Sequence, residues 1–293
     1  MGSVIRIGDI SVARVWESSI RLPLRQLGPE DELVARHRDW LHPRFADPVD
    51  DMFEFDWQSW IIEMDGLVIV VDPCAGNGRE RPHIQPLHHL DLPWLDRFAA
   101  TGYTPERVDA VFCTHLHCDH CGWNTRRVGD RWVPTFPNAR YYFVDTEVRR
   151  WTPDTPGHRA VDYNANVFED SVKPVLEAGL ATIVSANHRI APGVVIEPAH
   201  GHSDGHCVLR IDYKGIRLRF TGDAFHHPLQ VSDTALHLGG DDDLASAIAT
   251  RKTLRSTIAS EGSYFIPAHF PAPHAGRIIA AQDGQFRFVP LGQ

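Results

Sequence analysis

Four side chains of metal-binding types lie within six residues of one another, at His115, His117, Asp119 and His120. They directly follow the strand-like run Ala110–Cys113. Imidazole nitrogens and carboxylate oxygens are ligands that zinc, iron and manganese accept. A solvated histidine-rich loop without function is the alternative interpretation. The spacing, the position after a strand and matching residues downstream favour a metal site.

Three later loops carry the same residue types, and each of them follows a strand-like run. The first is Ala199–His206, which contains four histidines or aspartates besides its glycines; the second is Thr221–Asp223, and the third is Ile266–His269. Active sites of α/β proteins usually lie on loops at the carboxyl ends of strands. These loops are therefore candidates for the rest of the site.

Two predicted hairpins position these loops. They cover Trp57–Asp72 and Cys207–Asp223, with Asp65–Gly66 and Lys214–Gly215 as two-residue turn signals. Each hairpin is followed by a helical stretch and a further strand that ends at a histidine. The similarity suggests two pseudo-symmetric halves.

The clearest predicted helix covers residues 241–261, with three aspartates as favourable N-terminal charge and Gly262 as its stop. Apolar periodicity also predicts helices at 93–101 and 166–178 and the start of a helix at 146. Further strands are predicted at 11–24, 110–113, 139–144, 264–266 and 285–289.

Length and composition indicate one domain over residues 1–293, since 43% of the residues are hydrophobic. Residues 1–56 are expected to form an N-terminal strand and an extension or arm. Within the arm, residues 28–51 are charged and interrupted by prolines. The arm is expected to cover the mouth of the site or a partner subunit, and a homodimer is compatible with it.

Charge and apolar runs restrict the partners. The net charge of −9 and the lack of a block rich in lysine and arginine argue against nucleic acid. No run has the length of a membrane span, and residues 1–6 do not resemble a signal peptide. We expect a cytoplasmic protein that acts on a small molecule.

The five cysteines fit a reducing compartment, because their number is odd and their spacing is scattered. Cys118 and Cys121 form a C-x-x-C pair inside the metal cluster. They are expected to pack beside the metal ions, with a redox role as the lesser alternative.

The order of these motifs resembles the metallo-β-lactamase superfamily. It runs His-x-His-x-Asp-His from His115, then Gly-His-Ser-x-Gly-His from Gly201, then Gly222–Asp223, then the late His269. Within the superfamily, the run that follows Asp223 is most similar to the lactonase and methyl parathion hydrolase branch. The resemblance implies an αββα sandwich of two mixed sheets flanked by helices, beginning near Trp57.

The resemblance also implies a binuclear site. Asp223 would bridge two divalent ions about 3.5–4 Å apart, and its negative charge would offset theirs. Zinc is the first expectation, with manganese, cobalt or iron as alternatives. One ion would be bound by His115, His117 and His202, and the other by Asp119, His120 and His269.

The chemistry that this implies is hydrolysis of small-molecule lactones or carboxylic esters by a metal-bridging hydroxide. N-acyl homoserine lactones are the first substrates to test. The alternatives are an organophosphate triester hydrolase, a thioesterase similar to glyoxalase II, and an iron-dependent oxidative member of the same fold.

Further histidines and carboxylates are candidates for supporting roles. Asp119, Asp223 and His226 are the predicted catalytic residues. Asp119 and Asp223 are predicted to bind metal as well, and Asp119 would orient the hydroxide or carry a proton. His226 stands where lactonases of the superfamily often have a tyrosine that donates to the substrate. It is expected either to donate a hydrogen bond or to pack beside the ligands. His206 fits a position next to a ligand, and His200 is either exposed or an added donor.

Overall fold

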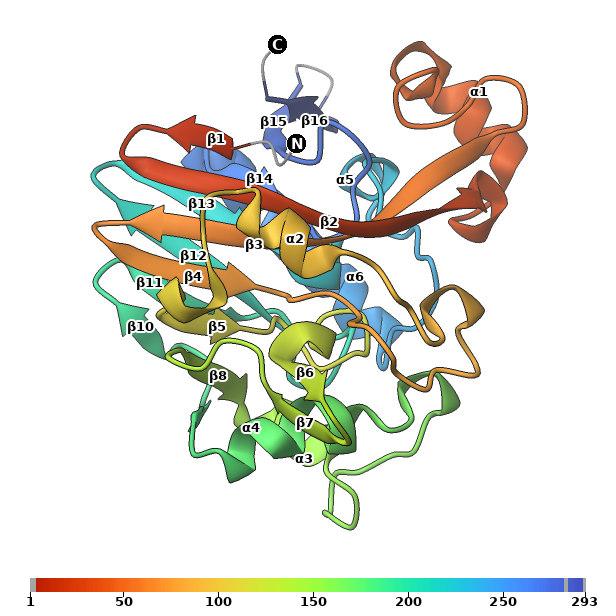
Figure 1. Cartoon of the computed structure of the whole chain (residues 1–293). Helices are drawn as coiled ribbons and strands as arrows, with labels where there is room; N and C mark the ends of the chain where they lie inside the picture. Colours follow the sequence, from red (N-terminus) through yellow and green to blue (C-terminus); the bar gives the residue numbers. More distant parts are fainter. Residues whose placement is uncertain (1–3, 282–283, 292–293) are drawn as a thin grey trace. The chain divides into compact units, whose positions relative to one another are not determined.

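The computed structural model describes residues 4–281 and 284–291, and Figure 1 labels most of its helices and strands. Residues 1–3, where the sequence predicts no signal peptide, lie outside the described residues together with 282–283 and 292–293. The chain divides into two compact units. Unit 1 comprises Met1–Ser18 and Trp57–His188, and unit 2 comprises Ser19–Asp56 and Arg189–Gln293. A single domain over residues 1–293 stays a prediction.

A seven-stranded sheet forms the centre of unit 1, in the order β1-β2-β3-β4-β5-β8-β9. The boundary between the units falls within the long strands β2 and β3. Strands β4, β5, β8 and β9 run parallel to their neighbours in this series. The strands are β1 (Val4–Ile7), β2 (Ile10–Pro23), β3 (Met52–Met64), β4 (Leu67–Val71), β5 (Ala110–Phe112), β8 (Arg140–Val144) and β9 (Ala181–Val184).

The hairpin of β3 and β4 forms where the sequence predicts it. Met64 pairs with Leu67, and the two turn residues Asp65 and Gly66 have φ angles of 50° and 78°. Two successive positive φ angles match the right-handed twist of the strands, which explains the Asp-Gly pair. Because β4 and β5 are parallel, the loops after them leave from the same edge of the sheet.

Helices and a small hairpin complete unit 1. The predicted helices at 93–101 and 146 are confirmed as α2 (Trp94–Ala99) and α3 (Asp145–Trp151). The predicted helix over 166–178 is a π-helical turn (Phe168–Val172) followed by α4 (Lys173–Glu177). Strands β6 (Thr125–Val128) and β7 (Arg131–Pro134) pair as a separate hairpin.

A buried carboxylate ties β2 to the loop after β4. The Glu17 side chain is fully buried and accepts hydrogen bonds from the backbone N–H groups of Ala75 and Gly76 and from the Trp123 indole, at 2.9, 3.0 and 2.7 Å. Gly122 lies directly against Ala75, since a Cβ at Gly122 would be 1.8 Å from the Ala75 carbonyl oxygen. This packing fixes the segment that follows the first histidine cluster.

The second seven-stranded sheet lies in unit 2, in the order β10-β11-β12-β13-β14-β15-β16. All neighbours are antiparallel except β13 and β14. The strands are β10 (Arg189–Ala191), β11 (Val194–Pro198), β12 (Cys207–Tyr213), β13 (Ile216–Phe220), β14 (Tyr264–Ile266), β15 (Gly276–Ala280) and β16 (Phe286–Pro290). The predicted hairpin over 207–223 is β12 and β13.

The helices of unit 2 are α1 (Glu30–Leu41), α5 (Leu229–Ser232) and α6 (Leu244–Glu261). In α6 the Asp243 side chain caps the helix by accepting from the Ser246 N–H at 3.1 Å, and Gly262 ends it with a φ of 60°. Short 3-10 turns lie at Leu24–Gln26, Gln85–Leu87, Pro105–Arg107, Gly122–Asn124, Asp162–Asn164 and Gly222–Ala224.

Helix α1 lies in residues 28–51, where the sequence predicts an extension or arm but no helix. Pro29 stands directly before the helix, where a missing N–H and a fixed φ do no harm. Only a few apolar side chains, among them Leu33, Val34 and Leu41, are buried along it. This sparse pattern hides the helix from a search for periodicity.

These elements confirm an α/β fold with two large mixed sheets and helices. Across the described ranges, no helix combines the length and the apolar content that a bilayer crossing requires.

Candidate metal centre

In unit 1, the ends of two parallel strands fix the first histidine loop. Asp72 follows β4, and its two carboxylate oxygens accept from the Thr114 backbone N–H at 2.7 Å and from the Thr114 hydroxyl at 2.9 Å. The Asp72 N–H in turn donates to the Phe112 carbonyl at 3.0 Å. These bonds hold the chain directly after β5, where the cluster begins.

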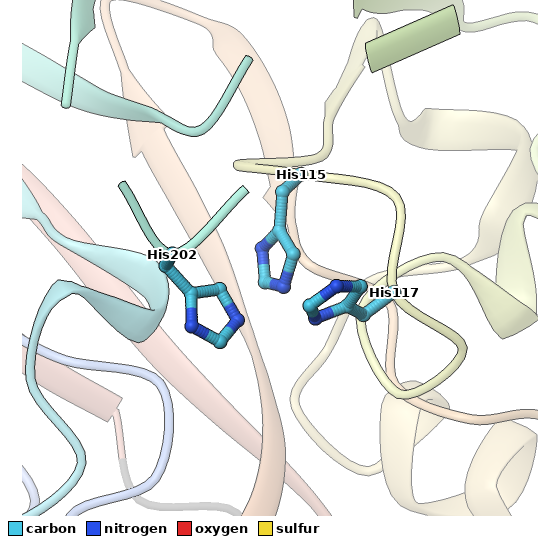
Figure 2. A group of neighbouring side chains, drawn as sticks. All are labelled: His115, His117 and His202. Atoms are coloured by element: carbon cyan, nitrogen blue, oxygen red, sulfur yellow. The ribbon is translucent and has the colours of Figure 1, made fainter. Parts of the chain in front are cut away.

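The three histidines of this loop lie against one another. The ring centroids of His115 and His117 are 4.4 Å apart, and those of His115 and His120 are 4.2 Å apart. All three residues are buried, and Figure 2 shows His115 and His117 projecting from the loop. The loop therefore gathers three imidazoles, as the sequence predicts.

Oxygen partners set the orientation of two of these rings. The Nδ1 atom of His115 lies 3.1 Å from the Thr114 hydroxyl, and the Nδ1 atom of His120 lies 3.2 Å from Asp72 Oδ2. A ring that uses Nδ1 in this way presents Nε2 to a metal ion. The structure thus explains how Asp72 supports a ligand that is distant from it in sequence.

Asp119 lies beside His120, with its Oδ2 atom 3.6 Å from His120 Nε2. Its side chain is 17% exposed, the most accessible of the four. The Trp57 indole on β3 donates to the same oxygen at 3.0 Å. Trp57 is a residue of the site that the sequence does not indicate, because its partner lies 62 positions away.

The backbone of the loop is held at Leu116, between the first two histidines. Its N–H donates to the buried carboxylate of Glu147 at 2.9 Å, and its carbonyl accepts from the Asn164 amide at 2.9 Å. Glu147 also accepts from the Trp151 indole at 2.9 Å. These polar groups fix the direction of the loop.

Two aromatic residues contact His117. The rings of Trp151 and Tyr163 meet it edge to face, with centroids at 5.3 and 5.4 Å. The Tyr163 hydroxyl lies 3.5 Å from His117 Nε2. The structure thereby places a phenol group beside a predicted ligand residue.

In unit 2, the predicted ligands gather around the Asp223 carboxylate, which stands on the turn after β13. Its Oδ1 atom lies 2.9 Å from His269 Nε2, and its Oδ2 atom lies 3.3 Å from His202 Nε2. The two oxygens therefore face two different histidines. All three side chains are buried.

The rings of His202 and His269 are held from behind by oxygen atoms. His202, labelled in Figure 2, has its Nδ1 atom 3.0 Å from Asp241 Oδ1. His269 has its Nδ1 atom 2.8 Å from the Asp56 carbonyl, and its ring stacks on Phe55 at 4.1 Å. Burial acts to raise the pKa of Asp241, but the hydrogen bond from His202 and the nearby positive charges lower it overall.

His226 is the third histidine at this carboxylate. Its Nε2 atom is 3.2 Å from Asp223 Oδ2, and one atom each of His202, Asp223 and His226 lie within 4.8 Å of one another. Burial lowers the pKa of the His226 imidazole, although the Asp223 charge acts in the opposite direction. The sequence leaves a packed and a donating role open for His226, and both agree with this position.

Two further histidines have the places that the sequence suggests. His206 is buried, accepts from the Asp223 N–H with Nε2 at 3.2 Å and contacts the Ala199 carbonyl with Nδ1 at 3.0 Å. His200 is exposed.

In unit 1, the thiols of Cys118 and Cys121 are buried, and burial raises the pKa of both. A neutral thiol is a poor nucleophile.

The donor set of each unit fits divalent metal ions. Buried imidazoles and carboxylates whose orientation is set by neighbouring oxygen and N–H groups are characteristic of sites for zinc and related ions. Unit 1 supplies His115, His117, Asp119 and His120, and unit 2 supplies His202, Asp223 and His269.

The family model of the Metallo-beta-lactamase superfamily matches residues 58–269 of the chain. The chain belongs to this superfamily. The match confirms the family, the fold and the enzyme class expected from the sequence, a metal-dependent hydrolase.

Among known proteins, an N-acyl homoserine lactonase of Bacillus cereus is 26% identical to the chain over 161 residues. The aligned part spans 55% of this chain and 55% of that lactonase, so the match covers about half the length of each protein.

Two solved structures share the fold over the whole chain. The hydrolase AbOPH of the beta lactamase superfamily has a TM-score of 0.82 and 22% identity, with 100% of this chain and 98% of that chain covered. AidC, a dizinc quorum-quenching lactonase in complex with a product, has a TM-score of 0.77 and 18% identity at the same coverage.

Proposed function

We propose that the protein is a dinuclear metal-dependent hydrolase of small-molecule lactones or carboxylic esters. The observation that carries the proposal is the Asp223 carboxylate, whose two oxygens face His269 and His202 separately. A carboxylate that bridges two ions needs this division of its oxygens. The seven proposed ligands are His115, His117, Asp119, His120, His202, Asp223 and His269.

Two bound ions would supply an activated water molecule and polarise the carbonyl group of the substrate. The protein's own residues orient the ligands. Trp57 donates to Asp119 and keeps one carboxylate oxygen directed, so that the other oxygen is available to a metal ion or a proton. Zinc is the proposed metal, and AidC, which shares the fold, is a dizinc lactonase.

Tyr163 is proposed to contact the substrate. The superfamily's lactonases often place a tyrosine three residues after the bridging aspartate, but this chain has His226 there. The phenol of Tyr163 instead lies next to His117 Nε2 at 3.5 Å. A substrate oxygen polarised near His117 would lie within reach of this hydroxyl group, which can donate a hydrogen bond.

N-acyl homoserine lactones are the proposed first substrates. The Bacillus cereus relative is a lactonase for these compounds, and the fold is shared with AidC, which was solved with N-hexnoyl-L-homoserine, a product. A cytoplasmic location and a homodimer stay predictions.

The test combines metal analysis with a panel of lactones, aryl esters, thioesters and phosphotriesters. We expect two zinc ions per chain and lactone hydrolysis that a chelator abolishes and zinc restores. Hydrolysis that survives complete removal of metal would overturn the proposal. Preference for phosphotriesters or thioesters would make that compound class the substrate in place of lactones and carboxylic esters. Bound iron with oxygen-dependent turnover would indicate the oxidative alternative.

A substitution at Asp223 tests its proposed bridging role. Asp223→Asn should lower kcat/KM by about 100-fold or more and reduce the bound zinc, because the amide cannot offset two dications. Asp130→Asn is the matched control, since Asp130 is fully exposed. If Asp223→Asn keeps two ions and the full rate, the bridge is wrongly assigned.

A further inference from the structure

The loop that carries His202 rests on the beginning of α6. The Asp242 N–H donates to the His202 carbonyl at 3.0 Å, and the Asp243 N–H donates to the Gly201 carbonyl at 2.9 Å. The Thr250 hydroxyl donates to the His200 carbonyl at 2.6 Å. Three successive carbonyl groups of the loop are thus bound by one short stretch of chain.

The contact between loop and helix is too close for a side chain at position 201. Gly201 has a φ of 127°, and a Cβ atom there would lie 2.2 Å from the Ala247 N atom. Glycine is therefore required by the packing as well as by the backbone angle. The backbone of His202 is placed by this docking.

The ring of His202 has a separate partner in the same stretch. Its Nδ1 atom lies 3.0 Å from Asp241 Oδ1, while its Nε2 atom faces Asp223. The side chains of Asp241 and His202 are 4% and 5% exposed. Because a carboxylate only accepts, the contact with Asp241 requires a proton on Nδ1, and a ring in that tautomer would offer the Nε2 lone pair to a metal ion.

A buried arginine holds the carboxylate in turn. Arg251 on α6 has its Nη1 atom 3.6 Å from Asp241 Oδ2, and its Nε atom donates to the Thr234 carbonyl at 3.0 Å. Arg251 is 1% exposed. The arginine offsets the buried negative charge and leaves Oδ1 directed at His202.

We infer that Asp241 is a positioning residue for a metal ligand, forming a carboxylate–histidine–metal series with His202. The inference rests on the proposed metal centre. The sequence assigns Asp241 only a favourable charge near a helix N-terminus, but the capping side chain is that of Asp243. The side chain of Asp241 is directed to His202 instead.

The test compares Asp241→Asn and Asp241→Ala with Asp243→Asn. The control removes the same charge two residues away, and asparagine caps a helix as well as aspartate does. Zinc affinity is measured by competition with a chromophoric chelator, and ligand geometry by the visible spectrum of the cobalt-substituted protein. We expect one ion to bind about 10–100-fold more weakly in Asp241→Asn, and at least as weakly in Asp241→Ala. The cobalt spectrum should change in both and stay unchanged in Asp243→Asn.

The outcomes separate the inference from the proposed function. Wild-type protein that binds no zinc would overturn the metal centre, and the positioning role with it. Two ions in wild type with unchanged affinity and spectrum in Asp241→Asn would overturn the positioning role alone. A lower melting temperature of the metal-free variant, without a change in affinity or spectrum, would show a purely structural role and overturn it equally.

Discussion

Four predicted histidine ligands share one orientation device, an oxygen atom at Nδ1. The partner is a hydroxyl group for His115, a carboxylate for His120 and His202, and a backbone carbonyl for His269. An oxygen atom at this position limits rotation of the ring and leaves Nε2 on the opposite side, where a metal ion can bind. The four residues share the position of an oxygen atom at Nδ1, and the chemical type of that oxygen differs among them.

The role of Tyr163 is a prediction at this scale. Tyr163→Phe removes only the hydroxyl group that lies 3.5 Å from His117 Nε2. One lost hydrogen bond to the substrate is worth about 1.4 kcal/mol, so kcat/KM for lactones should fall about tenfold. Metal content should stay unchanged, because the ring still packs against His117.

Tyr213→Phe is the control for this variant, because Tyr213 lies at the end of β12 and packs against Lys214. Kinetics and zinc content are measured on the same preparations. An unchanged kcat/KM in Tyr163→Phe would mean that the phenol only packs, and loss of zinc would mean that it supports His117.

The proposed ligand residues stand out in the sequence because their types, spacing and positions after strands are local properties. The groups that hold these residues in place could not be predicted from the sequence. Asp72 acts through a parallel strand, and Glu147 and Asn164 act through backbone atoms of Leu116. Asp241 acts from the segment before α6. Only Asp72 leaves a signal, since it directly follows a predicted strand.

At the scale of elements, the docking of the His202 loop on α6 predicts an unusually sensitive glycine. Gly201→Ala would force the loop away from Ala247. We expect an unfavourable backbone angle and overpacking to lower the free energy of unfolding of the metal-free protein by about 2–4 kcal/mol. Zinc affinity should fall as well, because His202 moves with the loop. Denaturant titration and chelator competition measure the two effects.

Gly215→Ala provides the matched control for that variant. Gly215 also has a positive φ, 79°, but nothing lies within 4 Å of a Cβ atom built there. In its alanine variant, the free energy of unfolding should therefore fall only by the cost of the unfavourable backbone angle, about 1–2 kcal/mol. Equal losses in the two variants would show that the contact with α6 is not important.

The elements differ in how clearly the sequence predicts them. Both hairpins are clear because Asp65–Gly66 and Lys214–Gly215 combine turn chemistry with flanking apolar runs. Helix α1 is not clearly predicted, because its apolar positions are few and the prolines around it indicate an interruption of regular structure. Strands β1 and β15 are short and have little alternation, and each is defined by pairing with a neighbour.

At the scale of the whole molecule, the seven proposed ligands come from both units, four from unit 1 and three from unit 2. Metal that binds only the folded chain stabilises it by RT ln(1 + [L]/Kd), about 4 kcal/mol at a thousandfold excess over Kd. Hydrogen exchange should therefore slow by up to about a thousandfold on adding zinc. We expect this at loops of both units, 113–121, 199–206 and 266–270, wherever exchange requires an opening that releases the metal.

The turn between β6 and β7, at residues 128–131, is the internal reference for this experiment, because it contains no proposed ligand. Its exchange should be nearly the same with and without zinc. Protection confined to 113–121 would mean that the cluster of unit 1 binds metal without His202, Asp223 and His269. Protection confined to the loops of unit 2 would assign the metal to the His202, Asp223 and His226 group instead. Protection in the loops of both units is the expected result if all seven proposed ligands bind metal.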